Sequence, residues 1–163
     1  MQMDVLLQPA AQSPRKLDRV RNSTPSRVNC RIDQAMMKRI WNYARRSREE
    51  ITARIEQLER EWDLERVLET NAAGLALSGV LLSAFSSRKW LLLPAAVLAT
   101  LLQHSLTRTS APVQLLRRLG IRTRREIESE KYAMRLLRGD FDNLKDISDE
   151  THRAIEALRM TRP

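Results

Sequence analysis

The chain has 163 residues and a formal net charge of +9, with only 4% aromatic residues and four glycines. This length suits one domain with its own core and is short for two large independent domains. The single cysteine, Cys30, excludes a disulfide framework and a cysteine-only metal site. Because the composition favours helices and offers little material for sheets, we expect an all-α fold.

The first segment, residues 1–29, contains Pro9, Pro14 and Pro25 among polar residues and lacks a sustained hydrophobic periodicity. Such a pattern is typical of a disordered or loosely docked tail. The segment has no basic region followed by a long apolar run, so it does not resemble a signal peptide. We therefore predict a disordered N-terminal tail over residues 1–29.

Residues 30–66 carry apolar residues at steps of three and four, which predicts amphipathic helices on the cytoplasmic side of a membrane. Ser47 and Glu50 fit a capping box, in which each side chain satisfies the other residue's backbone amide. One long helix and two helices meeting near Ser47 fit the pattern equally well. The apolar stripe consists of Ile32, Met36, Ile40, Tyr43, Ile51, Ile55, Leu58 and Trp62.

Two uncharged runs, residues 71–87 and 90–107, contain 17 and 18 residues. A membrane-spanning helix needs roughly 17 to 25 mostly apolar residues. Neither run has a polar stripe, which is typical of helices in lipid or in the core of a large protein. We expect a transmembrane helical hairpin over residues 67–107, with spans over about 69–86 and 90–106.

Both runs have features of membrane helices at their ends and along their faces. Long cations and indole rings favour the headgroup level, and small residues four positions apart let helices approach closely, although Ala-rich helices also show this spacing. The predicted interface anchors are Trp62, Arg66, Arg88, Lys89, Trp90 and Arg108. The predicted helix-packing residues are Gly74, Ser78, Gly79, Ser83, Ala95 and Ala99.

Equal rises on either side of the turn place Asn71 level with His104 near the cytoplasmic end of the hairpin. The expected polar layer consists of Glu69, Asn71, Gln103 and His104. Hydrogen bonding between the helices, or hydration, is the simpler interpretation of this layer. The alternative is a ligand, proton or metal role, for which His104 has no partner ligands at a recognisable spacing.

Residues 108–163 form a basic region that we expect to be helical and cytoplasmic. Ser110 fits the start of a short amphipathic helix along the membrane surface, and Gly120 fits its end. Thr123 and Glu126 fit a second capping box, which opens a helix that should end before Gly139. A last helix is expected near the C-terminus, with few apolar positions for docking.

The distribution of Lys and Arg predicts the orientation of the hairpin. Three arginines lie within about 20 residues before the first span and six within about 20 after the second, against two cations in the turn. Since cations are retained on the cytoplasmic side, both termini should be cytoplasmic and the turn at residues 86–89 outside. The expected partners are a bilayer with anionic headgroups and a second copy or another membrane protein. Nucleic acid is disfavoured because Glu126, Glu128 and Glu130 interrupt the basic run.

Motifs of nucleotide binding, metalloprotease or hydrolase chemistry do not occur. Carboxylates among arginines are interpreted as a salt-bridged surface, so no catalytic residue, cofactor or metal is predicted. We expect a non-enzymatic membrane protein that serves as an anchored interaction or scaffold module. Two alternatives are a soluble helical oligomer that buries the hairpin between subunits, and a membrane carrier or enzyme using Asn71, Gln103 and His104.

Three stretches in order carry a resemblance to a known family: residues 60–82, the run 88–106 and the basic segment 115–141. With these the chain resembles the YgaP-like transmembrane-domain family, small bacterial inner-membrane proteins of unknown function. The resemblance implies two spans and a bacterial inner membrane. Where relatives have a Trp-Cys-Pro element, only Pro112 is present here, so the resemblance implies no thiol chemistry for this chain.

Overall fold

The computed structural model describes residues 18–107 and 111–161, and every regular element within these ranges is a helix. The expected all-α fold is confirmed for this part of the chain. The chain divides into two compact units, each described by itself. We call Met1–Cys30 with Leu64–Ile121 the hairpin unit, and Arg31–Asp63 with Arg122–Pro163 the bundle unit.

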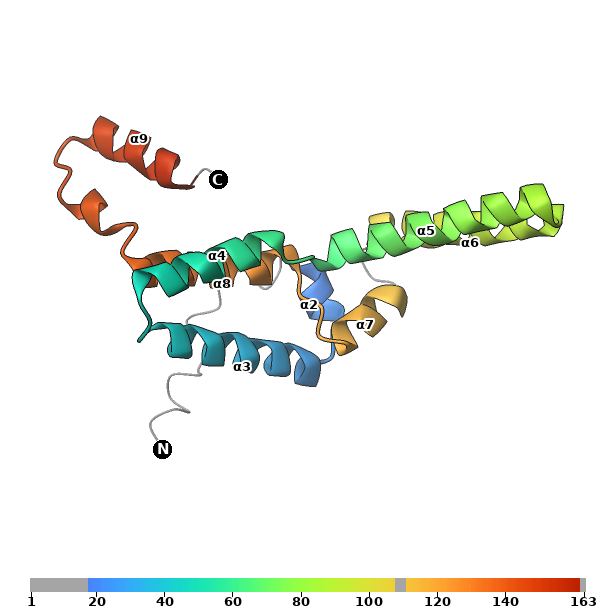
Figure 1. Ribbon diagram of the computed structural model, residues 1–163, viewed down its shortest axis with the longest axis horizontal. Helices are drawn as coiled ribbons and strands as arrows, with labels where there is room; N and C mark the ends of the chain where they lie inside the picture. The colour runs from blue at the N-terminus through green and yellow to red at the C-terminus, as the bar shows by residue number, and fades with distance from the viewer. Residues whose placement is uncertain (1–17, 108–110, 162–163) are drawn as a thin grey trace. The chain divides into compact units, whose positions relative to one another are not determined.

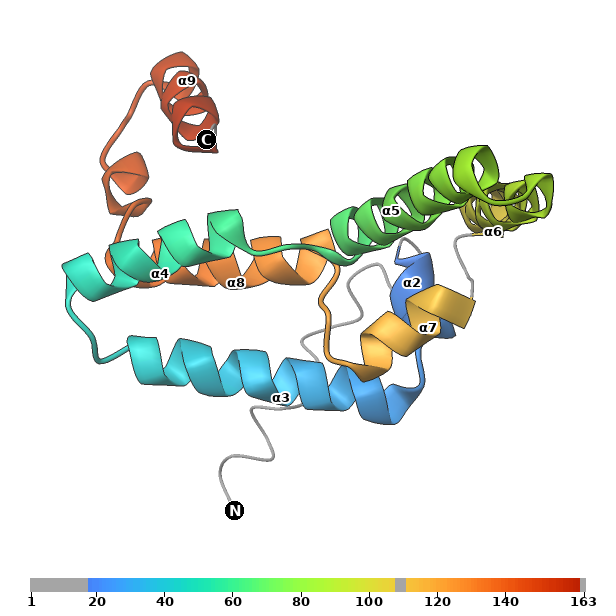
Figure 2. The ribbon, with the colours of Figure 1, turned by 45° about the vertical axis from the view of Figure 1, so that its right-hand side comes forward.

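The hairpin unit is built around two antiparallel helices, which lie side by side in both ribbon views (Figures 1 and 2). At their base, α7 and α2 close a small core in which Leu64, Leu68 and Val113 are buried and Val20 packs against them. The helices of this unit are α2 (Arg19–Ser23), the start of α3 (Ser26–Tyr43), α5 (Leu64–Phe85), the 3₁₀-helix η2 (Arg88–Leu91), α6 (Leu92–Thr107) and α7 (Ala111–Arg118).

The first long helix of the hairpin begins earlier than the sequence predicted. Helix α5 starts at Leu64 rather than near residue 69, because Leu64 and Leu68 are 2% and 7% exposed and pack into the core at the base. The predicted boundary between residues 66 and 67 therefore lies inside a helix, and that prediction was wrong. The predicted turn is present, and the chain reverses at Ser86 and Ser87 before η2.

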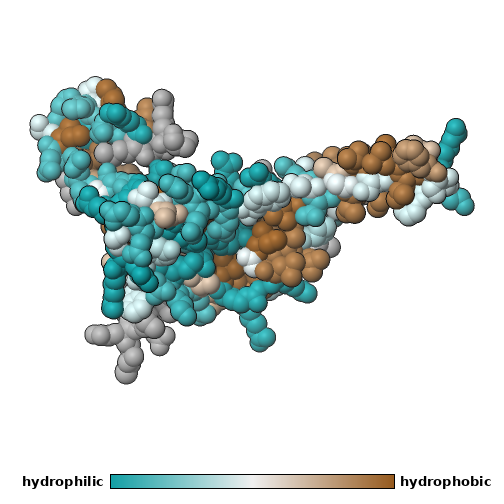
Figure 3. All heavy atoms as spheres, viewed as in Figure 1, coloured by the Kyte–Doolittle hydropathy of each residue, from teal (hydrophilic) through white to brown (hydrophobic). Residues whose placement is uncertain are grey.

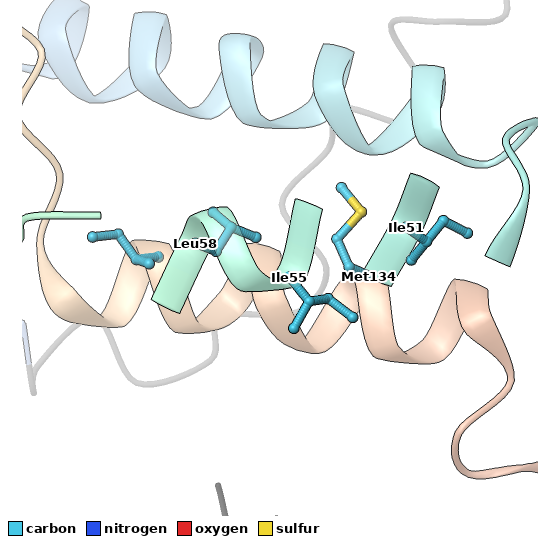
Figure 4. Close-up of a cluster of buried hydrophobic side chains, with 5 residues drawn as sticks. Ile51, Ile55, Leu58 and Met134 are labelled. Atoms are coloured by element: carbon cyan, nitrogen blue, oxygen red, sulfur yellow. The ribbon is translucent and has the colours of Figure 1, made fainter. Parts of the chain in front are cut away.

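The bundle unit packs α4 antiparallel to α8, with α3 alongside (Figure 2). Its core contains Ile51, Ile55 and Leu58 of α4 against Ile127 and Met134 of α8. Figure 4 labels the three α4 side chains and Met134 in this cluster. Ile40 and Tyr43 of α3 pack against this cluster. The remaining helices are α4 (Arg48–Arg60), α8 (Arg124–Arg138), η3 (Asp142–Lys145) and α9 (Glu150–Thr161).

Local capping signals determine where several helices begin and end. At Ser47 the side-chain oxygen accepts from Glu50 N (3.3 Å), and the Glu50 carboxylate accepts from Ser47 N (3.1 Å). Thr123 and Glu126 form the same reciprocal pair. Both predicted capping boxes are confirmed, and the choice between one helix and two near Ser47 is settled in favour of two. Two glycines with positive φ follow helices at the predicted places: Gly120 (91°) and Gly139 (85°).

The prediction of a disordered tail over residues 1–29 was wrong for its last part. Asp18 caps α2 by accepting from Arg21 N at 3.0 Å, and α3 already begins at Ser26. Pro25, one of the prolines on which the predicted tail rested, provides the carbonyl that accepts from Val28 N in the first turn of α3. The rest of the predicted tail, residues 1–17, lies outside the described residues.

Candidate functional site

The outer surface of the α5–α6 hairpin is apolar over most of its length. The large apolar side chains on this surface are 40 to 88% exposed on α5 and 43 to 74% exposed on η2 and α6. Figure 3 shows this surface as a continuous hydrophobic band with hydrophilic atoms at the tip. The exposed apolar residues are Leu75, Leu77, Val80, Leu81, Leu82 and Phe85, with Trp90, Leu91, Leu92, Leu98, Leu102 and Leu106.

Two segments are long and apolar enough to cross a membrane, one within Arg48–Phe85 and the other Arg88–Leu106. Only 17% and 6% of the residues in their apolar windows are buried within the chain. A core helix of a soluble monomer would bury most of such a window, since apolar surface is costly in water. The hairpin therefore leaves its apolar surface for another environment or partner to cover.

Inside the hairpin, Gly79 permits the close approach of the two helices. A Cβ atom at Gly79 would lie 2.5 Å from Pro94 Cδ, 3.1 Å from Leu93 Cβ and 3.2 Å from the Trp90 carbonyl oxygen. Gly79 thus lies opposite residues 93 and 94, whereas equal rises predict residue 96. The shift of about two residues has two causes: the residues of η2 rise about 2.0 Å each instead of about 1.5 Å, and Ser87 before them is extended (φ −151°, ψ 139°).

The predicted helix-packing residues divide into two groups. Gly79 is buried and lies against α6 as expected, whereas Ser83 is half-buried and its packing role stays a prediction. The other four positions are exposed, so the expectation that they pack between α5 and α6 of one chain was wrong. These positions are Gly74, Ser78, Ala95 and Ala99. A Cβ at Gly74 would meet nothing within 4 Å, which places it on the outer surface.

Hydroxyl groups along the hairpin are satisfied by their own helices. Ser78 Oγ donates to the Gly74 carbonyl (2.8 Å), Ser83 Oγ to the Val80 carbonyl (2.6 Å) and Thr100 Oγ1 to the Ala96 carbonyl (2.9 Å). Such bonds remove the need for water around these hydroxyls. The exposed surface is therefore compatible with a medium that offers no hydrogen bonds.

The predicted polar layer forms only in part. Asn71 is exposed, and its Nδ2 donates to the Val67 carbonyl of its own helix (2.7 Å). This bond lies within α5 and is not the predicted bond between the two helices. His104 lines an open pocket of about 300 Å³ together with Glu69. Gln103 is exposed and does not line this pocket. The register shift explains the change, since it moves His104 toward Leu68 and Glu69 and away from Asn71.

The predicted interface anchors lie on exposed positions. Trp62 and Trp90 are 47% and 43% exposed, and the side chains of Arg88 and Lys89 are exposed at the tip. Arg66 is exposed on the first turns of α5. Arg108 lies outside the described residues, so its predicted role stays a prediction.

Helix α7 uses its apolar face differently from the prediction. Val113 is 1% exposed, and Leu116 packs with it against the first turns of α5. This face therefore packs inside the protein and cannot contact a membrane surface. The expectation that α7 lies with this face on the membrane was wrong. Leu115 and Leu119 remain 59% and 71% exposed on α7 and just after it.

Arg117 is fully buried at the base of the hairpin unit. Its guanidinium donates to Asn29 Oδ1 (2.8 Å), to the Ile121 carbonyl (3.2 Å) and to Thr24 Oγ1 (3.4 Å). Asn29 in turn donates to the Arg21 carbonyl (2.9 Å). Arg117 therefore joins α7 to α2 and α3, a role that the sequence analysis, which counted it only among the arginines after the second span, did not predict.

A buried carboxylate, Glu130, is the charge centre of the bundle unit. Its side chain is 0% exposed and accepts from Arg39 Nη2 and Arg54 Nη2, each at 2.8 Å. Arg122 bridges Glu130 to Glu61. Three helices and the segment before α8 therefore meet at one ionised group.

The surroundings of Glu130 determine its protonation state. Burial alone would raise the pKa of Glu130, but hydrogen bonds from Arg39 and Arg54 and the charge of Arg122 outweigh burial and lower it to about 2. Burial alone would lower the pKa of Arg122, but the hydrogen bonds that Arg122 donates to Glu61 and the negative charge of Glu130 outweigh burial and raise it. Glu130 and Arg122 are therefore both ionised near neutral pH, which suits structural bridging.

The carboxylates were interpreted as a salt-bridged surface; Glu130 is salt-bridged, but the surface location was wrong for Glu130 and Glu126, which are 0% and 4% exposed. A signal was present in the sequence, because Glu130 lies three residues after Ile127 and four before Met134, on the stripe that forms the core. Within the described residues, no group of three or more His, Cys, Asp or Glu side chains could hold a metal ion.

Comparison with known proteins returned no match: no protein-family model, curated protein or solved structure is significantly similar to the chain. The resemblance to the YgaP-like transmembrane-domain family therefore stays a hypothesis.

Proposed function

We propose that the protein is a small, non-enzymatic integral membrane protein whose α5–α6 hairpin crosses a bilayer and anchors a helical interaction module. The observation that carries this proposal is the apolar, uncharged and largely exposed surface of the hairpin. The self-satisfied hydroxyls of Ser78, Ser83 and Thr100 support it, because polar groups in lipid need partners within the protein.

The length of the hairpin fits a bilayer. Helix α5 has 22 residues and spans about 33 Å, while η2 and α6, with 4 and 16 residues, span about 32 Å together. The hydrocarbon core of a typical bilayer is about 30 Å thick. The uncharged part of α5 is shorter, so Arg66 and Glu69 must reach toward the interface or the bilayer must thin locally.

Transfer of the exposed side chains into lipid provides the driving force. Each Leu, Val or Phe near the centre of a span contributes about 0.3 to 0.6 kcal/mol to insertion. Eleven such residues are exposed on the hairpin, and together they contribute on the order of 3 to 6 kcal/mol. Burying the polar residues at the base of the hairpin in lipid would reduce this insertion free energy. Insertion is therefore most favourable when these residues lie at headgroup level.

Two crossings return the chain to the side from which it started, so the segments before α5 and after α6 lie on the same side. The excess of arginines on these segments over the cations of the turn supports a cytoplasmic location for both. Together with the family resemblance, this supports a bacterial inner membrane, with anionic headgroups as the lipid partner.

The bundle unit is the proposed interaction module. Its exposed apolar side chains include Trp41 (57%), Leu136 (64%) and Ile155 (60%), which offer contact area to a protein partner. A second copy of the chain or another membrane protein is the proposed partner.

Alkaline carbonate extraction of membranes tests the proposal against a soluble oligomer that buries the hairpin between subunits. The account predicts that the protein stays in the membrane pellet after the carbonate wash and is released only by detergent. Recovery in the carbonate supernatant would contradict a spanning hairpin and favour the oligomer. A peripheral membrane protein from the same cells serves as the control for complete release.

A further inference from the structure

A pocket between α5 and α6 at the base of the hairpin has the lining of a ligand site. It has a volume of about 300 Å³ and is open on one side. Its walls combine apolar and polar side chains from both helices. The lining residues are Glu65, Leu68, Glu69, Leu101, His104 and Ser105.

His104 Nδ1 is buried and has no hydrogen-bond partner within the described residues. A buried polar atom without a partner destabilises the folded chain, so its presence calls for an explanation. In the tautomer that carries its proton on Nε2, Nδ1 of His104 is an acceptor, and a bound group in the pocket that donates a hydrogen bond would satisfy it. The unsatisfied atom is thus the first indication of a ligand.

The two carboxylates indicate the charge of that ligand. Glu65 and Glu69 are four residues apart on α5, so they project from the same face of the helix into the pocket lining. An anion would be repelled by them, and the side-chain arrangement does not fit a metal ion. A positively charged organic group with N–H donors fits both the carboxylates and the acceptor on His104.

We infer that this pocket binds an organic ammonium group, with Glu65 and Glu69 as the counter-charges and His104 Nδ1 as a hydrogen-bond acceptor. Leu68 and Leu101 provide apolar contact for the carbon chain next to the nitrogen. A primary ammonium fits better than a quaternary one, because a trimethylammonium group has no N–H to donate.

Such a group can come from the headgroup of phosphatidylethanolamine or from a free amine. The lipid source rests on the proposed function, because the pocket lies at headgroup level only if the hairpin spans a bilayer. The free amine does not depend on a membrane. The two sources therefore require separate arms in the test.

The two histidines of the chain make the test specific. Full-length protein labelled with ¹⁵N only in histidine gives ring signals for His104 in the pocket and His152, which is exposed in α9. In one arm, ethanolamine is titrated into protein in dodecylmaltoside micelles, with ethylene glycol as the uncharged analogue. In the other arm, the protein is placed in nanodiscs of phosphatidylglycerol that contain either phosphatidylethanolamine or phosphatidylcholine.

We expect ethanolamine to shift the His104 signals to saturation while those of His152 stay in place. Glu65→Gln and Glu69→Gln should each weaken the apparent affinity by about tenfold, as expected for the loss of a charge-assisted hydrogen bond. Glu56→Gln is the matched control, since Glu56 is exposed on α4 and does not line the pocket. It should leave the titration unchanged.

The outcomes separate the two sources of the ligand. A shift with ethanolamine and with phosphatidylethanolamine, but not phosphatidylcholine, assigns a lipid headgroup, and a shift with ethanolamine alone assigns a soluble amine. An unmoved His104 in both arms, an equal shift with ethylene glycol, or unchanged affinity in both Glu variants would overturn the inference. If the carbonate wash releases the protein and the released protein still binds ethanolamine, the ammonium site is supported and only the membrane hairpin is contradicted.

Discussion

Replacing Glu130 with Gln tests whether one buried carboxylate holds the bundle unit together. Gln preserves the shape of the side chain but removes the charge that balances Arg39, Arg54 and Arg122. Removing one partner of a buried ion pair costs about 3 to 5 kcal/mol. The lowering of the Glu130 pKa from 4.5 to about 2 corresponds to about 3 kcal/mol of stability at neutral pH. Both routes predict a loss of about 3 kcal/mol.

Amide hydrogen exchange of the full-length protein in micelles, resolved by mass spectrometry, measures this loss as the opening free energy of α4 and α8. Glu128→Gln on the same helix is the control, because Glu128 is 36% exposed and pairs only across the surface with Lys131. We expect the control to change the opening free energy by less than about 1 kcal/mol. Equal protection of α8 in the two variants would refute the assignment of Glu130 as the charge centre.

The same substitution has a defined pH dependence. Since the folded pKa of Glu130 is lower than its usual value, its contribution is fully present above about pH 4.5 and is lost as the pH falls toward 2. The difference in unfolding free energy between the original protein and Glu130→Gln should therefore be constant near neutral pH and shrink toward zero near pH 2. Denaturant titrations followed by circular dichroism measure it, and a difference that persists at pH 2 would argue against linkage through this group.

Two further substitutions address the hairpin. Gly79→Leu should destabilise the α5–α6 pair by about 1 to 3 kcal/mol, because its Cβ would lie 2.5 Å from Pro94 Cδ; Gly74→Leu, where a Cβ meets nothing within 4 Å, should have little effect. Chemical denaturation in micelles compares the two, and equal stabilities would count against the observed packing. Leu77→Arg should cost about 3 kcal/mol of insertion at the centre of the span and reduce the fraction retained after a carbonate wash, whereas Ser87→Arg at the tip should not. Full retention of Leu77→Arg would speak against lipid around α5.

Features that depend on neighbouring residues were predictable from the sequence. The capping boxes at Ser47 and Thr123 and the terminating glycine at Gly139 follow from bonds within a few residues of each helix end. The turn of the hairpin could also be placed, because it interrupts two uncharged runs. Helix ends and the hairpin turn therefore required no knowledge of tertiary contacts.

Features that depend on distant contacts were missed or displaced. The register of α5 against α6 shifted because η2 at Trp90 rises faster than an α-helix and Ser87 before it is extended, neither of which is visible in hydropathy. Arg117 was counted only among the flanking arginines and Glu130 was assigned to the surface, although Val113 and Ile127 at helical spacing place each on a buried face. Four of their partners, Arg39, Arg54, Thr24 and Asn29, lie 76 to 93 residues away in the chain, beyond the reach of local patterns.

The most direct test of the membrane hairpin is thiol labelling with an impermeant maleimide in intact expressing cells. The native Cys30 is exposed on α3 and reports on the side that holds both termini. Ser87→Cys, in a chain with Cys30→Ser, reports on the tip. The account predicts that the tip cysteine reacts in intact cells, while Cys30 of the original protein reacts only after permeabilisation. Labelling of Cys30 in intact cells, or protection of the tip until permeabilisation, would contradict it.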